Sequence, residues 1–305
     1  MNYRHAYHAG NFADVVKHVV LMMVIEHLKQ KDTPFRVIDT HAGVGAYDLT
    51  ADAAERTGEW HGGIGRLIGA DAEPLPAAMA QRLAPYLDIV RALNPPGSLR
   101  RYPGSPRIAR ALLRPQDRLV VNELHPEDAA LLRQQFPRDS QTKVLELDGW
   151  TALKALLPPN ERRGVILIDP PFEAPRELDR LVEGLAAAVK RFATGVFVLW
   201  YPIKDPRPVA AFHRRLVAAG HGSLLRIELM LRPAHDPDRL NGCGLIVVNA
   251  PYQLDASLTP VLAFLSGRMA ETSGSAQGWA QGWAQGWPAG GAQATRGAVE
   301  WLTKP

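Results

Sequence analysis

Short, uninterrupted apolar runs alternate with amphipathic stretches along most of the chain. The run Val165–Ile168 contains no polar position, which is typical of a strand buried on both faces. Comparable runs predict six further strands, at Arg36–Asp39, Leu119–Glu123, Thr142–Leu147, Gly195–Pro202, Leu224–Leu231 and Gly244–Asn249. Only turn residues join the last two, whereas helical patterns separate the others. The pattern therefore predicts an α/β, Rossmann-like fold with a seven-stranded sheet, mainly parallel, whose last two strands form an antiparallel hairpin.

A polar and aromatic segment without periodicity precedes the first predicted helix. Asn11 is a suitable N-cap, and Asp14 follows near the positive end of the helix dipole. Apolar positions recur at helical spacing from Val15 to Leu28. This pattern predicts an amphipathic helix that carries Lys17 and His18 in its second turn.

Two segments depart from the alternating pattern. Between residues 46 and 101, Ala/Leu-rich stretches predict a helical insertion subdomain, broken at Pro85, within a core formed by residues 1–45 and 102–266. The tetrapeptide Ala-Gln-Gly-Trp then occurs three times between Ala276 and Trp287. Gly, Ala and Gln cannot build a core, so residues 267–305 are expected to form a flexible tail, although residues 298–302 are apolar enough to rejoin the fold. The three tryptophans either have no role or stack on bases.

Composition excludes several classes of protein. No run of about 18 apolar residues exists, so no membrane span is expected. The single cysteine, Cys243, excludes an internal disulfide and fits a cytoplasmic location. The net charge of +4 is too small to indicate an anionic partner by itself. Seven arginines lie between Arg91 and Arg118 with one acid, Asp117, which predicts either phosphate contacts or a solvated basic surface.

The strand Val165–Ile168 runs directly into Asp169-Pro170-Pro171-Phe172. The prolines cannot extend the hydrogen-bonded ladder, so Asp169 lies at the carboxyl end of the strand, where open α/β sheets bind ligands. A carboxylate and a carbonyl of this loop can accept both hydrogens of an amino group, and the Phe172 ring offers a face on which a flipped base can stack. An ordinary turn after a strand is the alternative interpretation.

Two other strand ends carry candidate binding residues. Asp39 is followed by Gly43 and Gly45, a spacing that lets a ligand approach the backbone and that lacks the third glycine of many NAD-binding loops. Glu123 ends another strand, where a carboxylate can accept both hydroxyl protons of a ribose. The histidines of the first 18 residues match no common zinc spacing, so no metal site is expected.

The order of these motifs resembles one family. The segments concerned are Tyr3–His18, Asp39–Gly43, Tyr102–Pro106, Glu123–Pro126, Asp148–Gly149 and Asp169–Phe172. Together they resemble the bacterial large-subunit ribosomal RNA methyltransferase J family, whose members methylate N6 of one adenine in 23S rRNA. The resemblance covers residues 1 to about 266. It departs from the family at Phe172, where tyrosine is common, and at the Ala-Gln-Gly-Trp repeat.

The resemblance implies a site and a partner for the chain. It implies that S-adenosylmethionine is held by His18, His41, Ser105, Glu123, Asp148, Gly149 and Asp169. It implies that Tyr3 contacts the RNA substrate from the N-terminal arm. Arg4 and His5, which lie in the same arm, and Phe172, through base stacking, are also expected to contact the RNA. The enzyme is then expected to bind 23S rRNA, to act as a monomer without a metal or a membrane, and to contain a helical subdomain after the first strand.

The expected reaction is direct, in-line transfer of the sulfonium methyl group to adenine N6, with Asp169 as the catalytic acceptor of the amine hydrogens. A DNA adenine-N6 or cytosine-N4 methyltransferase is the first alternative, because the Asp-Pro-Pro-Phe motif does not separate these bases. A non-catalytic RNA-binding module is the second alternative, and an NAD-dependent oxidoreductase is the third. Asp169 argues against the second, and the missing glycine argues against the third.

Overall fold

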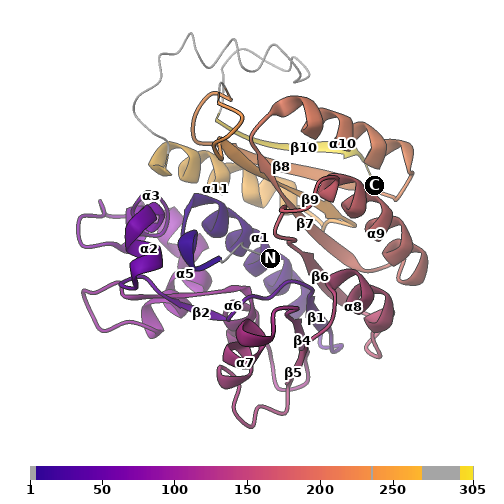
Figure 1. The fold of residues 1–305 in the computed structure, drawn as a ribbon, viewed down its shortest axis with the longest axis horizontal. Coiled ribbons are helices and arrows are strands. Elements are labelled where there is room, and N and C mark those ends of the chain that lie inside the picture. The colour runs from indigo at the N-terminus through magenta and orange to yellow at the C-terminus, as the bar shows by residue number, and fades with distance from the viewer. Residues whose placement is uncertain (1–4, 235, 270–295, 305) are drawn as a thin grey trace.

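A computed structural model describes residues 5–234, 236–269 and 296–304. A single large sheet forms its middle layer, and helices cover both of its faces (Figure 1). The Ala-Gln-Gly-Trp repeat between Ala276 and Trp287 lies outside the described residues, as do Tyr3 and Arg4. No described helix is long and apolar enough to cross a membrane.

The large sheet has eight strands in the order β10-β8-β9-β7-β6-β1-β4-β5 (Figure 1). Their bounds are β1 Arg36–Asp39, β4 Arg118–Asn122, β5 Thr142–Leu145, β6 Gly164–Ile168, β7 Val196–Ile203, β8 Leu224–Met230, β9 Gly242–Val248 and β10 Gly297–Thr303. The five strands from β5 to β7 are parallel, and β8 and β9 form the predicted antiparallel hairpin. The prediction of seven strands is wrong by one, because β10 pairs antiparallel with the outer side of β8.

Strand β6 shows why the sheet is buried on both faces. Val165 and Leu167 belong to the core cluster on one face, whereas Ile166 and Ile168 belong to the cluster on the other. The first face is covered mainly by α1 (Phe12–Lys29), α5 (Ala77–Ala92), α6 (Ser105–Leu112) and α11 (Leu254–Met269). The second face is covered by α8 (Gly149–Leu156), α9 (Glu177–Arg191) and α10 (Pro206–Ala218). The remaining helix of the parallel half is α7 (Pro126–Gln134).

Helix α1 begins where the sequence predicts. The Asn11 side chain accepts a hydrogen bond from the backbone N–H of Asp14 at 2.9 Å and caps the helix. Asp14 accepts in turn from the backbone N–H of Gly10 at 2.9 Å. Both side chains are buried, so the start of α1 is fixed against the core. The short 3-10 helix η1 (His5–Tyr7) precedes it.

The insertion after β1 contains a small ribbon as well as helices. Strands β2 (Ala46–Asp48) and β3 (Arg101–Pro103) pair antiparallel and bring its two ends together. Between them lie α2 (Asp52–Thr57), α3 (Glu59–Gly62), α4 (Gly65–Ile68) and α5. The predicted break at Pro85 is wrong, since α5 runs through it. Its neighbours Leu83, Tyr86 and Leu87 are fully buried, and this packing outweighs the backbone bond that proline removes.

Candidate active site

A pocket lies at the carboxyl ends of the four parallel strands β1, β4, β5 and β6. It brings together all the residues predicted to hold the cofactor, namely His18, His41, Ser105, Glu123, Asp148, Gly149 and Asp169. The strand ends converge because parallel strands finish at the same edge of a sheet. His18 reaches the pocket from α1, and Ser105 reaches it from the first turn of α6. The proximity of these residues was predicted, and their binding roles remain proposals.

Two carboxylates at strand ends are fixed by short hydrogen bonds. Glu123 accepts from the backbone N–H groups of Gly43 and His125, each at 2.9 Å. Burial raises the pKa of Glu123 even though these bonds oppose the shift. Asp39 accepts from the Ser105 hydroxyl at 2.6 Å, and burial raises the pKa of Asp39 to about 6. Glu123 is therefore a fixed acceptor at the pocket wall, and the buried Asp39 orients Ser105, which also lines the pocket.

Close packing explains the glycine at position 149. A Cβ atom there would lie 2.3 Å from His41 Nε2, so any larger residue would displace that ring. His41 is also held by the Thr40 hydroxyl, 2.9 Å from Nδ1. Burial lowers the pKa of His41 to about 4, so its ring is neutral at pH 7. The His41 ring therefore packs directly against Gly149 in the pocket wall.

A buried ion-pair network joins α1 to the loop after β6. Lys17 Nζ lies 2.6 Å from Asp169 Oδ2 and 2.9 Å from Asp14 Oδ1. Burial disfavours the charge on Lys17, but the two carboxylates outweigh burial and hold its pKa well above the usual value. Burial likewise opposes ionisation of Asp14, yet His5 and Lys17 hold its pKa well below the usual value. Lys17 is therefore a fixed cation against Asp169.

Lys17 was expected beside His18 on the helix that enters the site, but no binding or catalytic role was predicted for it. Its spacing of three residues from Asp14, on a helix whose other buried positions are mostly apolar, was the available signal. Asp169 uses only Oδ2 in this network, and its Oδ1 accepts no hydrogen bond from any described residue. One oxygen of Asp169 is therefore available to a ligand.

A buried chain of hydrogen bonds fixes the ring of His18. Its Nδ1 lies 2.8 Å from the Tyr102 hydroxyl, which lies 2.9 Å from the hydroxyl of Tyr86 on α5. Burial lowers the pKa of His18 to about 3, so the ring is neutral and carries one proton. The direction of the chain decides which nitrogen holds that proton.

Only one direction gives both hydroxyl protons an acceptor. If Tyr86 donates to Tyr102 and Tyr102 donates to His18 Nδ1, neither hydroxyl proton is left unpaired. In the reverse direction the hydroxyl proton of Tyr86, a fully buried residue, would have no acceptor among the described residues. That loss costs about 1–3 kcal/mol. The ring proton of His18 therefore resides on Nε2, the nitrogen that remains for the pocket.

Of the four residues predicted to bind the substrate, the structure describes two, His5 and Phe172. His5 lies at the pocket, with Nε2 2.9 Å from Asp14 Oδ2. Phe172 lines a neighbouring groove and packs edge-on against Trp200, with ring centroids 5.6 Å apart. Its φ of 53° is unusual for a residue other than glycine and marks a tightly constrained loop. Tyr3 and Arg4 are outside the described residues, and Trp200 was not foreseen from the sequence.

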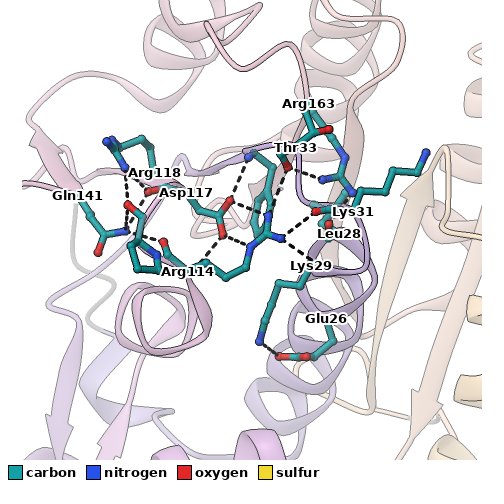
Figure 2. A network of polar contacts seen from close by, with 12 residues as sticks. Glu26, Leu28, Lys29, Lys31, Thr33, Arg114, Asp117, Arg118, Gln141 and Arg163 are labelled. Atoms are coloured by element: carbon teal, nitrogen blue, oxygen red, sulfur yellow. Dashed lines mark hydrogen bonds and ion pairs between the residues drawn. The ribbon is translucent and has the colours of Figure 1, made fainter.

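Several arginines of the segment between Arg91 and Arg118 form hydrogen bonds or ion pairs within the protein. Figure 2 shows Arg114 bonded to Asp117 and to carbonyl groups of Lys29, Lys31 and Thr33. The other arginines of the segment that donate to protein acceptors are Arg91, Arg107, Arg110 and Arg118. Arg107 and Arg110 join α6 to the segment after α7, whereas Arg91 and Arg118 bond only residues close to them in the sequence. Arg107, Arg110 and Arg114 therefore have structural roles within the fold.

The early histidines do not form a cluster. His5 bonds Asp14, His8 bonds Glu59, and His18 bonds Tyr102. Within the described part of the chain, no group of three or more His, Cys, Asp or Glu side chains is arranged to hold a metal ion. The histidines therefore have separate structural partners.

The strand order and the position of the pocket define the class of protein. β1 lies in the middle, with β4 and β5 on one side and β6 and β7 on the other, and the antiparallel β9 lies next to β7. The pocket spans β1, where the order of the strands reverses. This is the fold of a Rossmann-like, class I methyltransferase.

Comparison with known proteins identifies the family. The family model described as "Ribosomal RNA large subunit methyltransferase D, RlmJ" matches residues 32–284. The chain is 46% identical over 269 residues to ribosomal RNA large subunit methyltransferase J of Escherichia coli (strain K12), covering 88% of this chain and 94% of that protein. The Haemophilus influenzae protein of the same name is 42% identical over 267 residues, or 87% and 93% of the two chains. The chain therefore belongs to the ribosomal RNA large subunit methyltransferase J family.

A solved structure shares this architecture. The crystal structure of a Legionella pneumophila protein superposes with a TM-score of 0.79 at 35% identity, covering 88% of this chain and 96% of that one. The similarity thus extends over most of both chains.

Proposed function

We propose that this chain transfers a methyl group from S-adenosylmethionine to N6 of a single adenine in 23S rRNA. The observation that carries the proposal is the position of Asp169. Its carboxylate lies where the cofactor pocket meets the groove of Phe172, with Oδ2 held by Lys17 and Oδ1 available to a ligand. Membership of the methyltransferase J family supports methylation of large-subunit ribosomal RNA.

The chemistry of the pocket fits the proposed cofactor. Glu123, fixed by two backbone N–H groups, would accept the ribose hydroxyl protons. His18 would donate its Nε2 proton to the carboxylate of the methionine moiety. The other residues proposed to line the cofactor site are His41, Ser105, Asp148 and Gly149. When bound, S-adenosylmethionine supplies an electrophilic methyl group on sulfur, which leaves as a neutral thioether.

The protein contributes orientation and a proton acceptor. The lone pair of adenine N6 is delocalised into the ring, so the amine is a weak nucleophile. Acceptance of its hydrogens by Asp169 Oδ1 and the Pro170 carbonyl would aim the lone pair at the methyl group. As the N–C bond forms, the nitrogen becomes acidic, and its proton passes to Asp169 or to water. Lys17 holds the Asp169 carboxylate in place through an ion pair of 2.6 Å.

The remaining assignments concern the substrate and its surroundings. The exposed face of Phe172 would stack on the flipped adenine, and Tyr3, Arg4 and His5 would contact the RNA next to it. We propose that residues 1–45 and 102–266 form the catalytic core and that residues 46–101 form a helical subdomain. We expect a cytoplasmic location, because the proposed substrate is ribosomal RNA, and we propose that the protein acts as a monomer.

One experiment tests the reaction and its substrate together. Purified protein is incubated with methyl-tritiated S-adenosylmethionine and either deproteinised 23S rRNA, assembled large subunits or genomic DNA. Nucleosides from the labelled product are then identified by mass spectrometry. We expect N6-methyladenosine in rRNA alone. Label in DNA would support the DNA methyltransferase alternative, and no label in any nucleic acid would refute methyl transfer.

A further inference from the structure

A long groove leads away from the active site. It shares Lys17, Asp169 and Pro170 with the cofactor pocket, so the two are continuous at the catalytic carboxylate. One wall is formed by the insertion, from the end of α2 to α4. The other wall is formed by the end of β7 and the loop between β8 and β9. Phe172 and Trp200 lie between these walls, where the adenine would enter.

Three exposed cations line this groove from three different segments. Arg66 lies on α4, Lys204 follows β7, and Arg239 lies on the loop between β8 and β9. None of their side chains forms a hydrogen bond or an ion pair with any described residue. This contrasts with Arg114 and its neighbours, which are bonded to protein acceptors. Exposed cations without protein counter-ions around a groove attract a polyanion.

The acids of the groove do not cancel these charges. Asp14 and Asp169 are occupied by Lys17, and Glu59 is occupied by His8. The exposed acids of the groove are Glu173 and Asp238. Among the exposed side chains that line the groove, the three cations therefore outnumber the two acids.

Side chains from both walls line the same groove. The hydrogen bond to Glu59 raises the pKa of His8, and the charge of Lys204 on the opposite wall works against that shift. His8 and Glu59 belong to the side of η1 and the insertion, so Lys204 is within electrostatic range of that side. A strand lying between the walls would meet cations on both of its sides.

We propose that Arg66, Lys204 and Arg239 bind backbone phosphates of the RNA on either side of the flipped adenine. This proposal rests on the function proposed above and specifies how the substrate is held. The three cations would set the position of the strand without reading bases, since phosphate contacts carry no sequence information. The proposal places the RNA in this groove rather than on the arginine-rich segment between Arg91 and Arg118.

The test compares variants that remove three positive charges from different faces. The groove variant carries Arg66→Ala, Lys204→Ala and Arg239→Ala. The matched control carries Lys190→Ala, Arg191→Ala and Arg214→Ala, which are cations on or beside α9 and α10 that line none of the described pockets. A third variant, Arg100→Ala with Arg101→Ala, examines the remaining arginines of the arginine-rich segment. Affinity for transcribed 23S rRNA is measured at several salt concentrations, together with affinity for S-adenosylmethionine.

We expect the groove variant to lower the slope of log affinity against log salt by about 2–3, because each lost phosphate contact removes about 0.7–0.9. Its affinity for S-adenosylmethionine should equal that of the wild type. The control should keep the wild-type slope. An unchanged slope in the groove variant, or an equal loss in the control, would overturn the proposal. If the wild-type protein binds rRNA but methylates no nucleic acid, the proposed function fails separately from this one.

Discussion

The hydrogen-bond chain from Tyr86 through Tyr102 to His18 leads to a prediction about which ring nitrogen is protonated. The reverse direction of the chain leaves one buried hydroxyl without an acceptor, which costs about 1–3 kcal/mol. This corresponds to a preference of about 5- to 150-fold for the Nε2-protonated ring. We therefore expect the long-range proton–nitrogen spectrum of the protein to show His18 as this tautomer at pH 7.

Two substitutions test the two tyrosines of this hydrogen-bond chain separately. Tyr102→Phe removes the donor to His18 Nδ1, so the ring loses both its preferred tautomer and its fixed orientation. The affinity for S-adenosylmethionine should fall about 2- to 12-fold, the equivalent of one net hydrogen bond of 0.5–1.5 kcal/mol. Tyr86→Phe is the matched control, because it leaves the bond from Tyr102 to His18 in place. Its cofactor affinity and its tautomer should be those of the wild type.

The measurements are isothermal titration with S-adenosylmethionine and the histidine spectrum of each variant. A proton on His18 Nδ1 in the wild-type protein would refute the assignment. So would a change of tautomer in Tyr86→Phe, because only the reverse direction makes His18 depend on Tyr86 as an acceptor. A melting temperature for each variant shows whether the fold is retained.

Four further predictions concern other parts of the chain. Asp169→Ala should abolish methyl transfer while leaving the circular dichroism spectrum unchanged, and a rate within threefold of the wild type would contradict its role. Phe172→Tyr should be tolerated, whereas Phe172→Ala should lose base stacking of about 1–3 kcal/mol, measured as kcat/KM on rRNA. Deleting residues 275–288 should leave activity and melting temperature unchanged, because Gly, Ala and Gln build no core, and a fall in RNA affinity would show that its tryptophans bind RNA. Burial raises the pKa of Glu228 from 4.5 to about 7, although Arg226 opposes this shift. The protonated Glu228 carboxyl therefore makes its full contribution to the free energy of unfolding below about pH 4.5, and this contribution is lost as the pH rises through 7. Glu228→Gln should therefore weaken the decline in the free energy of unfolding between pH 5 and 8 by on the order of 3 kcal/mol, and an unchanged decline would contradict the shift.

The parallel half of the sheet and the site at its edge were predictable from local patterns. The run Val165–Ile168 has no polar position, and a strand of that kind must be covered on both faces. Once the strands are parallel, Glu123 and Asp169 must finish at the same edge, so a pocket could be expected there. The capping of α1 by Asn11 is likewise a local property of a few residues.

Contacts between distant residues were not predictable in the same way. Lys17 and Asp169 are separated by 152 positions, and nothing in either segment specifies the other. The arginine-rich segment was assigned from charge alone, but Arg114 bonds carbonyl groups more than 80 positions away. The pairing of β10 with β8 depends on an edge that exists only after the sheet has formed. The continuity of α5 through Pro85 reflects burial that the local sequence does not reveal.

The ribbon of β2 and β3 brings the entry and exit of the insertion together, with Ala46 opposite Pro103. Because the two ends of the insertion lie side by side, such a subdomain could normally be removed or exchanged as a unit. The core residues on either side of it would keep their positions. Here Tyr86, which lies within the insertion, completes the proton chain that orients His18 in the core. A minimal enzyme engineered without residues 46–101 would therefore lose the bonding partner of the buried Tyr102 hydroxyl, together with Tyr47, which lines the pocket. Chimeras that combine the core of one relative with the insertion of another should be built to keep this tyrosine pair intact.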